Sequence, residues 1–355
     1  MRDKYIGFDI DSKKTVACVV ERDRKEMYQT MKTDIEEMRK YLKQQREDGC
    51  QVHLTFEISG EAGYRYDALR DCVDTLTVSN PHKMTWIYRT RKKNDRIDAR
   101  KQAVLLSIGE VPAVHIPSME IRQWRVTIQQ RRTVVNRIVS VKSRIRALLK
   151  GNGLTQAQHK GSWWKLANLA WMRQQARDWT ETAIEQLWRI HLRGLLDELD
   201  QLNGRLKSLT SYLDRYLDSQ PGGVLLMSIP GVGPRTAEAV LAYTDDVHRF
   251  RRSRQYSAYF GLTPKLDESG QVRHLGHISK EGPSVVRWLI VESTWRAIQK
   301  CSFFKRFYER VECGQKQRKK TAVVATARKL LTIMRAMLLS GELFNEQSVG
   351  QALEA

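Results

Sequence analysis

The feature of this sequence that most constrains its fold is a stripe of leucines between residues 192 and 213. Each leucine follows the previous one by three or four residues, which places all of them on one face of a helix and is typical of a coiled coil. A second seam with this spacing runs between residues 121 and 145, and the segment 151–165 interrupts the two. We therefore expect a coiled-coil or helical arm over residues 116–219. The stripe consists of Leu192, Leu195, Leu199, Leu202, Leu206, Leu209 and Leu213, and the second seam of Ile121, Trp124, Ile128, Val135, Ile138 and Ile145.

The segment before the arm has the pattern of an α/β domain. Residues 4–20 read as two short strands joined by a polar turn, and residues 51–58 as a third strand. A helical pattern follows at 59–73, then a strand that ends at Pro81, then a basic segment that leads into another helix. This order predicts an α/β domain over residues 1–115.

The segment after the arm has a different character. Gly222 and Gly223 mark its start, and we expect a helical domain over residues 220–345, followed by a tail over 346–355. Two helices are expected at 283–299 and 320–340, with a loop through 267–283 between them and the preceding segment.

The charge of the chain points to a polyanionic partner. The chain has 355 residues, and its 61 Lys and Arg outnumber 40 Asp and Glu, which gives a formal net charge of +21. Each cation that meets a phosphate releases condensed counterions, so such an excess favours nucleic-acid binding. An anionic membrane would also suit this sign, but no transmembrane run, signal peptide or lipidation motif is evident. The five cysteines are scattered, which predicts reduced thiols in a cytoplasmic protein.

Four carboxylates lie where strands end and a helix begins. Asp9 and Glu57 each close an apolar strand, and Asp95 and Asp98 lie one turn apart on a predicted helix. Four clustered carboxylates repel one another unless a divalent metal neutralises them, and a two-metal site for phosphodiester cleavage needs such a cluster. Taken singly, each has a plainer interpretation: a turn residue at a strand end, or an ion pair with Arg91, Arg96 or Arg100 on a solvated helix.

The ordered motifs resemble a known family. YIGFD, TFEISG and KNDRIDAR are similar to the three acidic motifs of the DEDD transposases of the "one-ten" group of bacterial insertion sequences, which are bridge-RNA-guided recombinases. SIPGVGPRTAEAVLAY, RQYSAYFGLTP, ESG, ISKEGPSVVRWLI and TARKLLTIMRAMLLSGELF resemble that family's later blocks, in the same order. The resemblance implies an RNase H-like, RuvC-like catalytic domain, Mg²⁺ or Mn²⁺, donor and target DNA, a guide RNA, and a homodimer that assembles to a tetramer.

The resemblance also implies roles for single residues. It assigns metal binding to Asp9, Glu57, Asp95 and Asp98, and assigns Ser269 as a nucleophile that links covalently to DNA. Ser279 is the rival serine, although it falls in a different block. The family usually has a lysine three residues after the first aspartate, where this chain has Ser12. Asp11 lies on the same strand face as Asp9, so it is an alternative metal ligand.

Several residues are candidates for nucleic-acid contacts. The segment SIPGVGPRTA resembles a helix–hairpin–helix, in which glycines form a tight turn and helix amides meet a phosphate, although a plain connection within a core also fits. Basic runs at 89–93 and 316–320 suit phosphate contact or a solvated face. Trp163 and Trp164 suit either a cap on a helical hairpin or a contact with a partner. The predicted contact residues are Arg91, Lys92, Lys93, Gly231, Gly233, Arg235, Thr236, Arg273, Lys280, Lys319 and Lys320.

Three other functions share parts of this pattern. A Holliday-junction-resolvase-like nuclease needs the carboxylates but neither Ser269 nor the last domain. A non-catalytic DNA- or RNA-binding protein needs only the charge. A sugar-kinase or actin-like ATPase needs a small, glycine-bearing phosphate turn after the first aspartate, and the sequence IDSKK lacks one.

Overall fold

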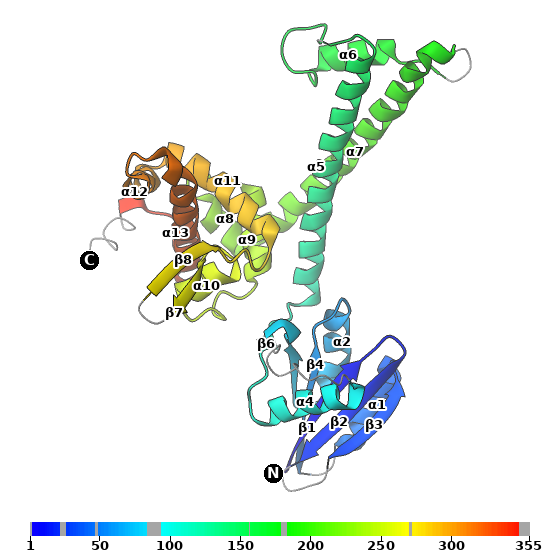
Figure 1. Cartoon of the computed structure of the whole chain (residues 1–355), viewed down its shortest axis with the longest axis vertical. Coiled ribbons are helices and arrows are strands. Elements are labelled where there is room, and N and C mark those ends of the chain that lie inside the picture. Colours follow the sequence, from blue (N-terminus) through cyan, green and yellow to red (C-terminus); the bar gives the residue numbers. More distant parts are fainter. Residues whose placement is uncertain are drawn as a thin grey trace. The chain divides into compact units, whose positions relative to one another are not determined.

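The computed structural model divides the chain into two compact units, residues 1–120 and 121–355. It describes residues 2–21, 26–46, 49–83, 94–155, 157–178, 183–269 and 272–347. Figure 1 shows the elements of both units, and each unit has its own hydrophobic core. None of the described helices is both long and apolar enough to cross a membrane.

The first unit is built on a mixed sheet of six strands in the order β3-β2-β1-β4-β5-β6. The central strands β1, β4 and β5 are parallel, whereas β2, β3 and β6 are each antiparallel to the neighbour that they extend. A mixed α/β unit of this kind is consistent with an RNase H-like transposase domain. The strands are β1 (Arg2–Ile10), β2 (Lys14–Glu21), β3 (Met27–Lys32), β4 (Cys50–Glu57), β5 (Thr75–Ser79) and β6 (Ala113–Val114).

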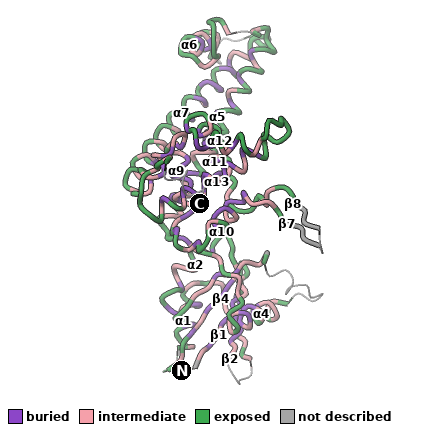
Figure 2. The backbone as a smooth tube through the Cα atoms, turned by 90° about the vertical axis from the view of Figure 1, so that its left-hand side faces the viewer, coloured by how far each residue is buried: buried purple, intermediate pink, exposed green. Residues whose placement is uncertain are grey.

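Helices cover both faces of this sheet, because successive side chains of a strand point to opposite faces. Ile6 and Phe8 of β1 pack with α1 (Ile35–Gln45) and α2 (Ala62–Leu69) on one face. Val16 and Cys18 of β2 pack against α4 (Asp95–Ser107) on the other face. The central strands therefore contain buried stretches, among them Ile6–Phe8 of β1 and Leu54–Phe56 of β4 (Figure 2).

The second unit begins with a pair of long helices. Helices α5 (Met119–Gly151) and α7 (Leu187–Asp218) lie side by side, with α6 (Leu166–Gln175) near the end of the pair (Figure 1). The leucine stripe contacts α5 within the same chain, while a coiled coil between subunits stays a prediction. Trp163 and Trp164 are partly buried against the hydrophobic cluster that α5, α6 and α7 form. Its buried members are Val134, Ile138, Val141, Ile145, Leu149, Met172, Leu192, Leu195, Leu196, Leu199 and Leu202.

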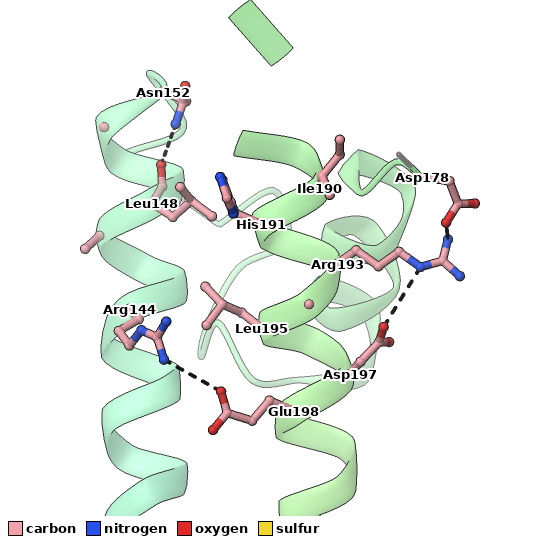
Figure 3. A pocket seen from close by; sticks show the side chains of 13 residues that line it. Arg144, Leu148, Asn152, Asp178, Ile190, His191, Arg193, Leu195, Asp197 and Glu198 are labelled. Atoms are coloured by element: carbon pink, nitrogen blue, oxygen red, sulfur yellow. Dashed lines mark hydrogen bonds and ion pairs between the residues drawn. The ribbon is translucent and has the colours of Figure 1, made fainter. Parts of the chain in front are cut away.

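A groove of about 910 Å³ lies between α5 and α7 (Figure 3). Its charged side chains pair with one another: Arg144 lies 3.6 Å from Glu198 across the groove, and Arg193 lies 2.6 Å from Asp178. These ion pairs join the two helices and the segment before α7. None of the candidate site residues lines this groove.

The rest of the second unit is a helical domain with one β-hairpin. Its core includes Trp124 and Ile128 of α5 and Leu213 and Leu217 of α7, so the long helices are continuous with it. The elements are α8 (Pro221–Met227), α9 (Pro234–Thr244), α10 (Ser253–Tyr259), β7 (Pro264–Ser269), β8 (Val272–Ile278), α11 (Ser284–Lys300), α12 (Ser302–Glu312), the short 3-10 helix η5 (Lys316–Arg318) and α13 (Lys319–Ser340).

The structure corrects the loop that was expected over residues 267–283. Strands β7 and β8 pair antiparallel there, with a shift of register between Pro264 and Leu266. Backbone hydrogen bonds hold this hairpin together. Its polar sequence PKLDES does not alternate between apolar and polar residues, so a strand could not be predicted from it. The expected helices at 283–299 and 320–340 are present as α11 and α13, and α12 lies between them.

Candidate active site

Strand register brings Asp9 and Glu57 together. Phe8 of β1 pairs in parallel with Phe56 of β4. The next residue of each strand is the carboxylate, so Asp9 and Glu57 are neighbours at the same edge of the sheet. Both follow buried phenylalanines and are themselves only partly buried. Alternation along β1 places Asp9 on the same face as Gly7, opposite to the face of Ile6 and Phe8.

Helix α4 lies directly over that face. A Cβ atom on Gly7 would lie 2.2 Å from the carbonyl oxygen of Ala99 and 2.5 Å from the nitrogen of Ala103, so only glycine permits this close approach. Asn94 caps the helix by accepting a hydrogen bond from the backbone amide of Arg96 at 3.0 Å. Asp95 and Asp98 form the first turn, where carboxylates are favoured by the helix dipole.

Polar partners that the sequence did not indicate engage these carboxylates. Lys14 Nζ lies 2.6 Å from Asp95 Oδ2, and Gln102 Nε2 donates to Glu57 Oε1 at 3.0 Å. Lys101 Nζ lies 3.7 Å from Asp98 Oδ1. Gln102 follows Asp98 by one helical turn, so it shares the face that looks onto the sheet. This spacing is the only signal by which sequence reasoning could have found it.

The electrostatics of the site favour a cation. The hydrogen bond and charge of Asp95 raise the pKa of the Lys14 ammonium, and the charges of Asp11 and Asp9 raise it further. Three carboxylates of the predicted site and its neighbourhood thus act on one cation. Asp11 is exposed in the turn between β1 and β2, where its backbone amide donates to the carbonyl of Lys14 at 3.1 Å.

The fit of a divalent metal rests on the chemistry of these donors. Within the described part of the chain, no three His, Cys, Asp or Glu side chains lie close enough together to hold a metal ion. Carboxylate oxygens are nevertheless the ligands that Mg²⁺ and Mn²⁺ prefer, and Lys14 already marks where their field draws positive charge. The residues present therefore suit a hard divalent ion.

Ser269 is the last residue of β7, in the second unit. It pairs with Val272 of β8, and Arg273 pairs with Glu268 in the same hairpin. The side chains of residues 266–275 lie outside the described part of the structure. The rival Ser279 follows β8; its amide donates to the carbonyl of Thr263 at 2.9 Å, and its Oγ accepts from the amide of Glu281 at 3.5 Å.

The glycine-rich segment before α9 is a tightly packed connection. Gly231 has a φ of 95°, and a Cβ atom there would lie 2.5 Å from the backbone nitrogen of Ala297 in α11. Gly233 is the N-cap of α9, and Pro234 occupies its first turn. Gly231 therefore has a packing role in addition to the phosphate contact predicted for it, whereas a Cβ atom on Gly233 would have nothing within 4 Å.

The structure corrects the surface role expected of Thr236. Its side chain is buried, and its hydroxyl lies 2.7 Å from the Ser293 hydroxyl, so it faces the core of the second unit. Arg235 is mostly covered and pairs with two carboxylates, those of Asp214 and Glu238. The amphipathic pattern of α9 did not reveal which of its polar residues are internal.

The remaining predicted contact residues differ in what can be said of them. Lys319 and Lys320 are exposed at the start of α13, directly after the basic η5. Lys280 is exposed, with a φ of 56°. Arg91, Lys92 and Lys93 lie outside the described residues.

Comparison with known proteins covers both units. A transposase model of the DEDD IS110 type matches residues 6–152, and a model described as the transposase IS116/IS110/IS902 family matches residues 224–309. A probable family 20 transposase of Pseudomonas aeruginosa is 26% identical over 279 residues, which span 77% of this chain and 79% of the relative.

Two further relatives align over smaller shares of their length. The transposase for insertion sequence element IS1111A of Coxiella burnetii is 29% identical over 244 residues, or 68% of this chain and 64% of the relative. A pilin gene-inverting protein of Moraxella lacunata is 29% identical over 125 residues, or 35% of this chain and 38% of the relative. With the carboxylate pattern at the edge of its sheet and both family models in order along it, the chain belongs to the IS110 family of DEDD transposases and is a DNA transposase or recombinase.

Proposed function

We propose that this transposase moves a mobile element by cutting DNA strands and rejoining them, with Asp9, Glu57, Asp95, Asp98 and Ser269 as its catalytic residues. The observation that carries the carboxylate assignment is the register of β1 and β4. It sets Asp9 beside Glu57 on the face that α4 covers, and α4 begins with the two other acids. Chance is a poor explanation for acids at two neighbouring strand ends beneath a helix whose first turn carries two more.

Ser269 is proposed as the group that conserves the energy of the broken bond. Its Oγ attacks a DNA phosphorus, the bond to one strand oxygen breaks, and that strand leaves with a free hydroxyl. A hydroxyl from another strand then attacks the serine phosphodiester and releases the serine. This exchange needs no ATP, whereas hydrolysis loses the bond energy. The inversion named for the Moraxella relative also requires strands to be rejoined after cutting, which supports exchange over hydrolysis.

The four carboxylates are the proposed holders of Mg²⁺ or Mn²⁺. When bound, such an ion activates the attacking hydroxyl and stabilises the leaving oxygen. The contribution of the chain is to fix the donors: Gly7 admits α4 close to β1, and Gln102 orients Glu57 through its hydrogen bond. Lys14 contacts one oxygen of Asp95, a proposed metal ligand.

Donor and target DNA and a structured guide RNA are the proposed partners. The net charge of +21 and the exposed Lys319 and Lys320 support polyphosphate binding. The packed helices α5 and α7 are the proposed platform for a homodimer that assembles to a tetramer. The proposed place of action is the cytoplasm, at the nucleoid.

The test looks for a covalent link between the protein and cleaved DNA. Protein, Mg²⁺, labelled donor and target DNA, and RNA transcribed from the DNA beside the gene are mixed and then denatured. We expect labelled protein on a gel and an adduct that maps to Ser269. Ser269→Ala should abolish both the adduct and recombination, while Ser279→Ala should retain them.

Other outcomes of this experiment contradict the assignment. An adduct at Ser279, or normal recombination by Ser269→Ala, would show that the nucleophile is elsewhere. Cleavage without any adduct would favour a resolvase-like nuclease. Wild-type recombination by any two of Asp9→Ala, Glu57→Ala, Asp95→Ala and Asp98→Ala would exclude the proposed carboxylate site.

A further inference from the structure

A second candidate site lies in the second unit, and none of the proposed catalytic residues lines it. A cavity of about 300 Å³ is enclosed by α5, α9 and α11. Small-molecule sites occupy roughly 300–1,000 Å³, so this volume suits a ligand of about the size of one nucleotide. The lining combines cations, one acid and an aromatic ring, and its principal members are Arg131, Arg132, Arg235, Glu238, Trp288 and Leu289.

The cationic wall of the cavity is formed by arginines whose positions are fixed. Arg131 is partly buried and donates from Nε to Thr210 Oγ1 at 3.0 Å. Burial and the nearby charge of Arg235 lower the pKa of its guanidinium, whereas the charges of Glu238 and Asp214 raise it. Arg132 lines the same wall one residue later. Guanidinium groups bind phosphate well, and both of these residues line the cavity.

Glu238 provides a buried hydrogen-bond acceptor at the cavity. Its side chain is only 2% exposed, and its Oε2 lies 2.9 Å from Arg235 Nη1. The geometry of this ion pair is not that of a hydrogen bond, so neither atom has a hydrogen-bond partner among the described residues. A buried polar atom in this state costs free energy that a ligand with a matching donor would recover.

Trp288 provides an aromatic platform at the same cavity. Its side chain is 51% exposed, whereas Val285, about one turn earlier on α11, is buried. The guanidinium carbon of Arg132 lies 5.5 Å from the centre of its ring. A large exposed aromatic residue beside arginines is the arrangement that single-stranded nucleic acids use for base stacking.

We propose that this cavity binds one unstacked nucleotide of a single-stranded DNA or RNA, with its base on Trp288, an amino group of the base donating to Glu238, and its phosphate paired with Arg131 and Arg132. Adenine, cytosine and guanine carry such an amino group, whereas thymine and uracil do not. The site therefore favours the first three bases. This binding does not depend on the strand chemistry proposed above.

The test observes Trp288 directly. Full-length protein is labelled with 5-fluorotryptophan, and Trp288→Phe identifies the ¹⁹F resonance of that residue. The probes are inorganic phosphate, the nucleoside 5′-monophosphates, and single-stranded hexamers of DNA and of RNA with one sequence. We expect the Trp288 resonance to move with AMP, CMP or GMP and with at least one hexamer, and to respond weakly to UMP and to phosphate alone. The two hexamers then distinguish a DNA strand from an RNA strand.

Affinity measurements on variants complete the test. Base stacking on an aromatic side chain contributes about 1–3 kcal/mol, so Trp288→Ala should weaken hexamer binding about 5- to 150-fold, while Trp288→Phe retains most of it. Trp295→Ala is the matched control, because Trp295 is also exposed on α11 but does not line the cavity. Glu238→Gln should remove the discrimination against uracil, because its amide also offers a donor.

Several results would overturn the proposal. Equal shifts with inorganic phosphate and with nucleotides would mean an anion site without base recognition. A Trp288 resonance that moves with protein concentration alone would mean that a second copy of the chain fills the cavity. Equal losses in Trp288→Ala and Trp295→Ala would exclude a specific role for the cavity. Ser269→Ala should bind the hexamers as the wild type does, so a failure of the cleavage proposal remains distinct from a failure of this one.

Discussion

Glu238→Gln gives a quantitative test of how the buried acid is held. Burial raises the pKa of Glu238 from its usual 4.5 to about 7, although the charges of Arg235 and Arg131 lower it and that of Asp214 raises it. Each pKa unit corresponds to about 1.4 kcal/mol, so ionising this residue weakens the folded state by about 3 kcal/mol at high pH. Because the folded pKa is the higher one, the favourable contribution is complete below pH 4.5 and is lost as pH rises through 7.

Urea unfolding between pH 5 and pH 8 measures this effect. All nine tryptophans except Trp86 lie in residues 121–355, so tryptophan fluorescence reports mainly on the second unit. Glutamine stays neutral, and the stability of Glu238→Gln relative to wild type should therefore grow by about 2.5 kcal/mol from pH 5 to pH 8. The control Glu342→Gln replaces an exposed acid in the same unit.

Two results would refute this reasoning. If wild type and Glu238→Gln changed in parallel with pH, the carboxyl would titrate at the same pH in the folded and unfolded chain. If Glu238→Gln were the less stable protein at pH 8, the ion pair with Arg235 would outweigh the cost of burial.

Three other perturbations test the fold and its charge. Gly7→Ala should displace α4 and lower the stability of the first unit by about 1–3 kcal/mol in thermal melts, whereas Gly60→Ala, with nothing within 4 Å of its added Cβ, should change little. Leu199→Asp places a charge in the buried cluster and should lower the melting temperature of the second unit, unlike Val139→Asp on an exposed position of α5. Replacing Lys319 and Lys320 by alanine should reduce the slope of log affinity for DNA against log salt by about two, and an unchanged slope would exclude both from phosphate contact.

The elements that could be predicted are those in which apolar residues form a continuous run or recur at a regular spacing in the sequence. The strands around Asp9 and Glu57 are buried on both faces and appear as apolar runs, and the leucine stripe appears as an unbroken 3-4 spacing. The elements that were missed have weak patterns. Strand β3 alternates between exposed and partly buried residues, and the short helix α1 follows it closely, so neither stands out in the sequence.

The polar partners of the site were not predictable from the same information. Lys14 opens β2, and its contact with Asp95 arises from the packing of α4 across the sheet, some 80 residues later in the chain. The burial of Thr236 could not be predicted for a similar reason. Its partner Ser293 comes from another helix, and the local spacing of apolar residues does not reveal such long-range pairs.

The two kinds of proposed catalytic residue differ in how far physics alone identifies them. A carboxylate at the end of a buried strand is an anomaly, because the chain must leave it solvated, paired or bound to a cation. The register of β1 and β4 makes the proximity of two of them, Asp9 and Glu57, a geometric consequence. A serine next to a glycine at the end of a hairpin is ordinary, because hydroxyls are common in turns and carry no unsatisfied charge. The proposal of the carboxylates therefore rests on the chain itself, whereas that of Ser269 rests on its family, and the covalent adduct is the measurement that would connect the two.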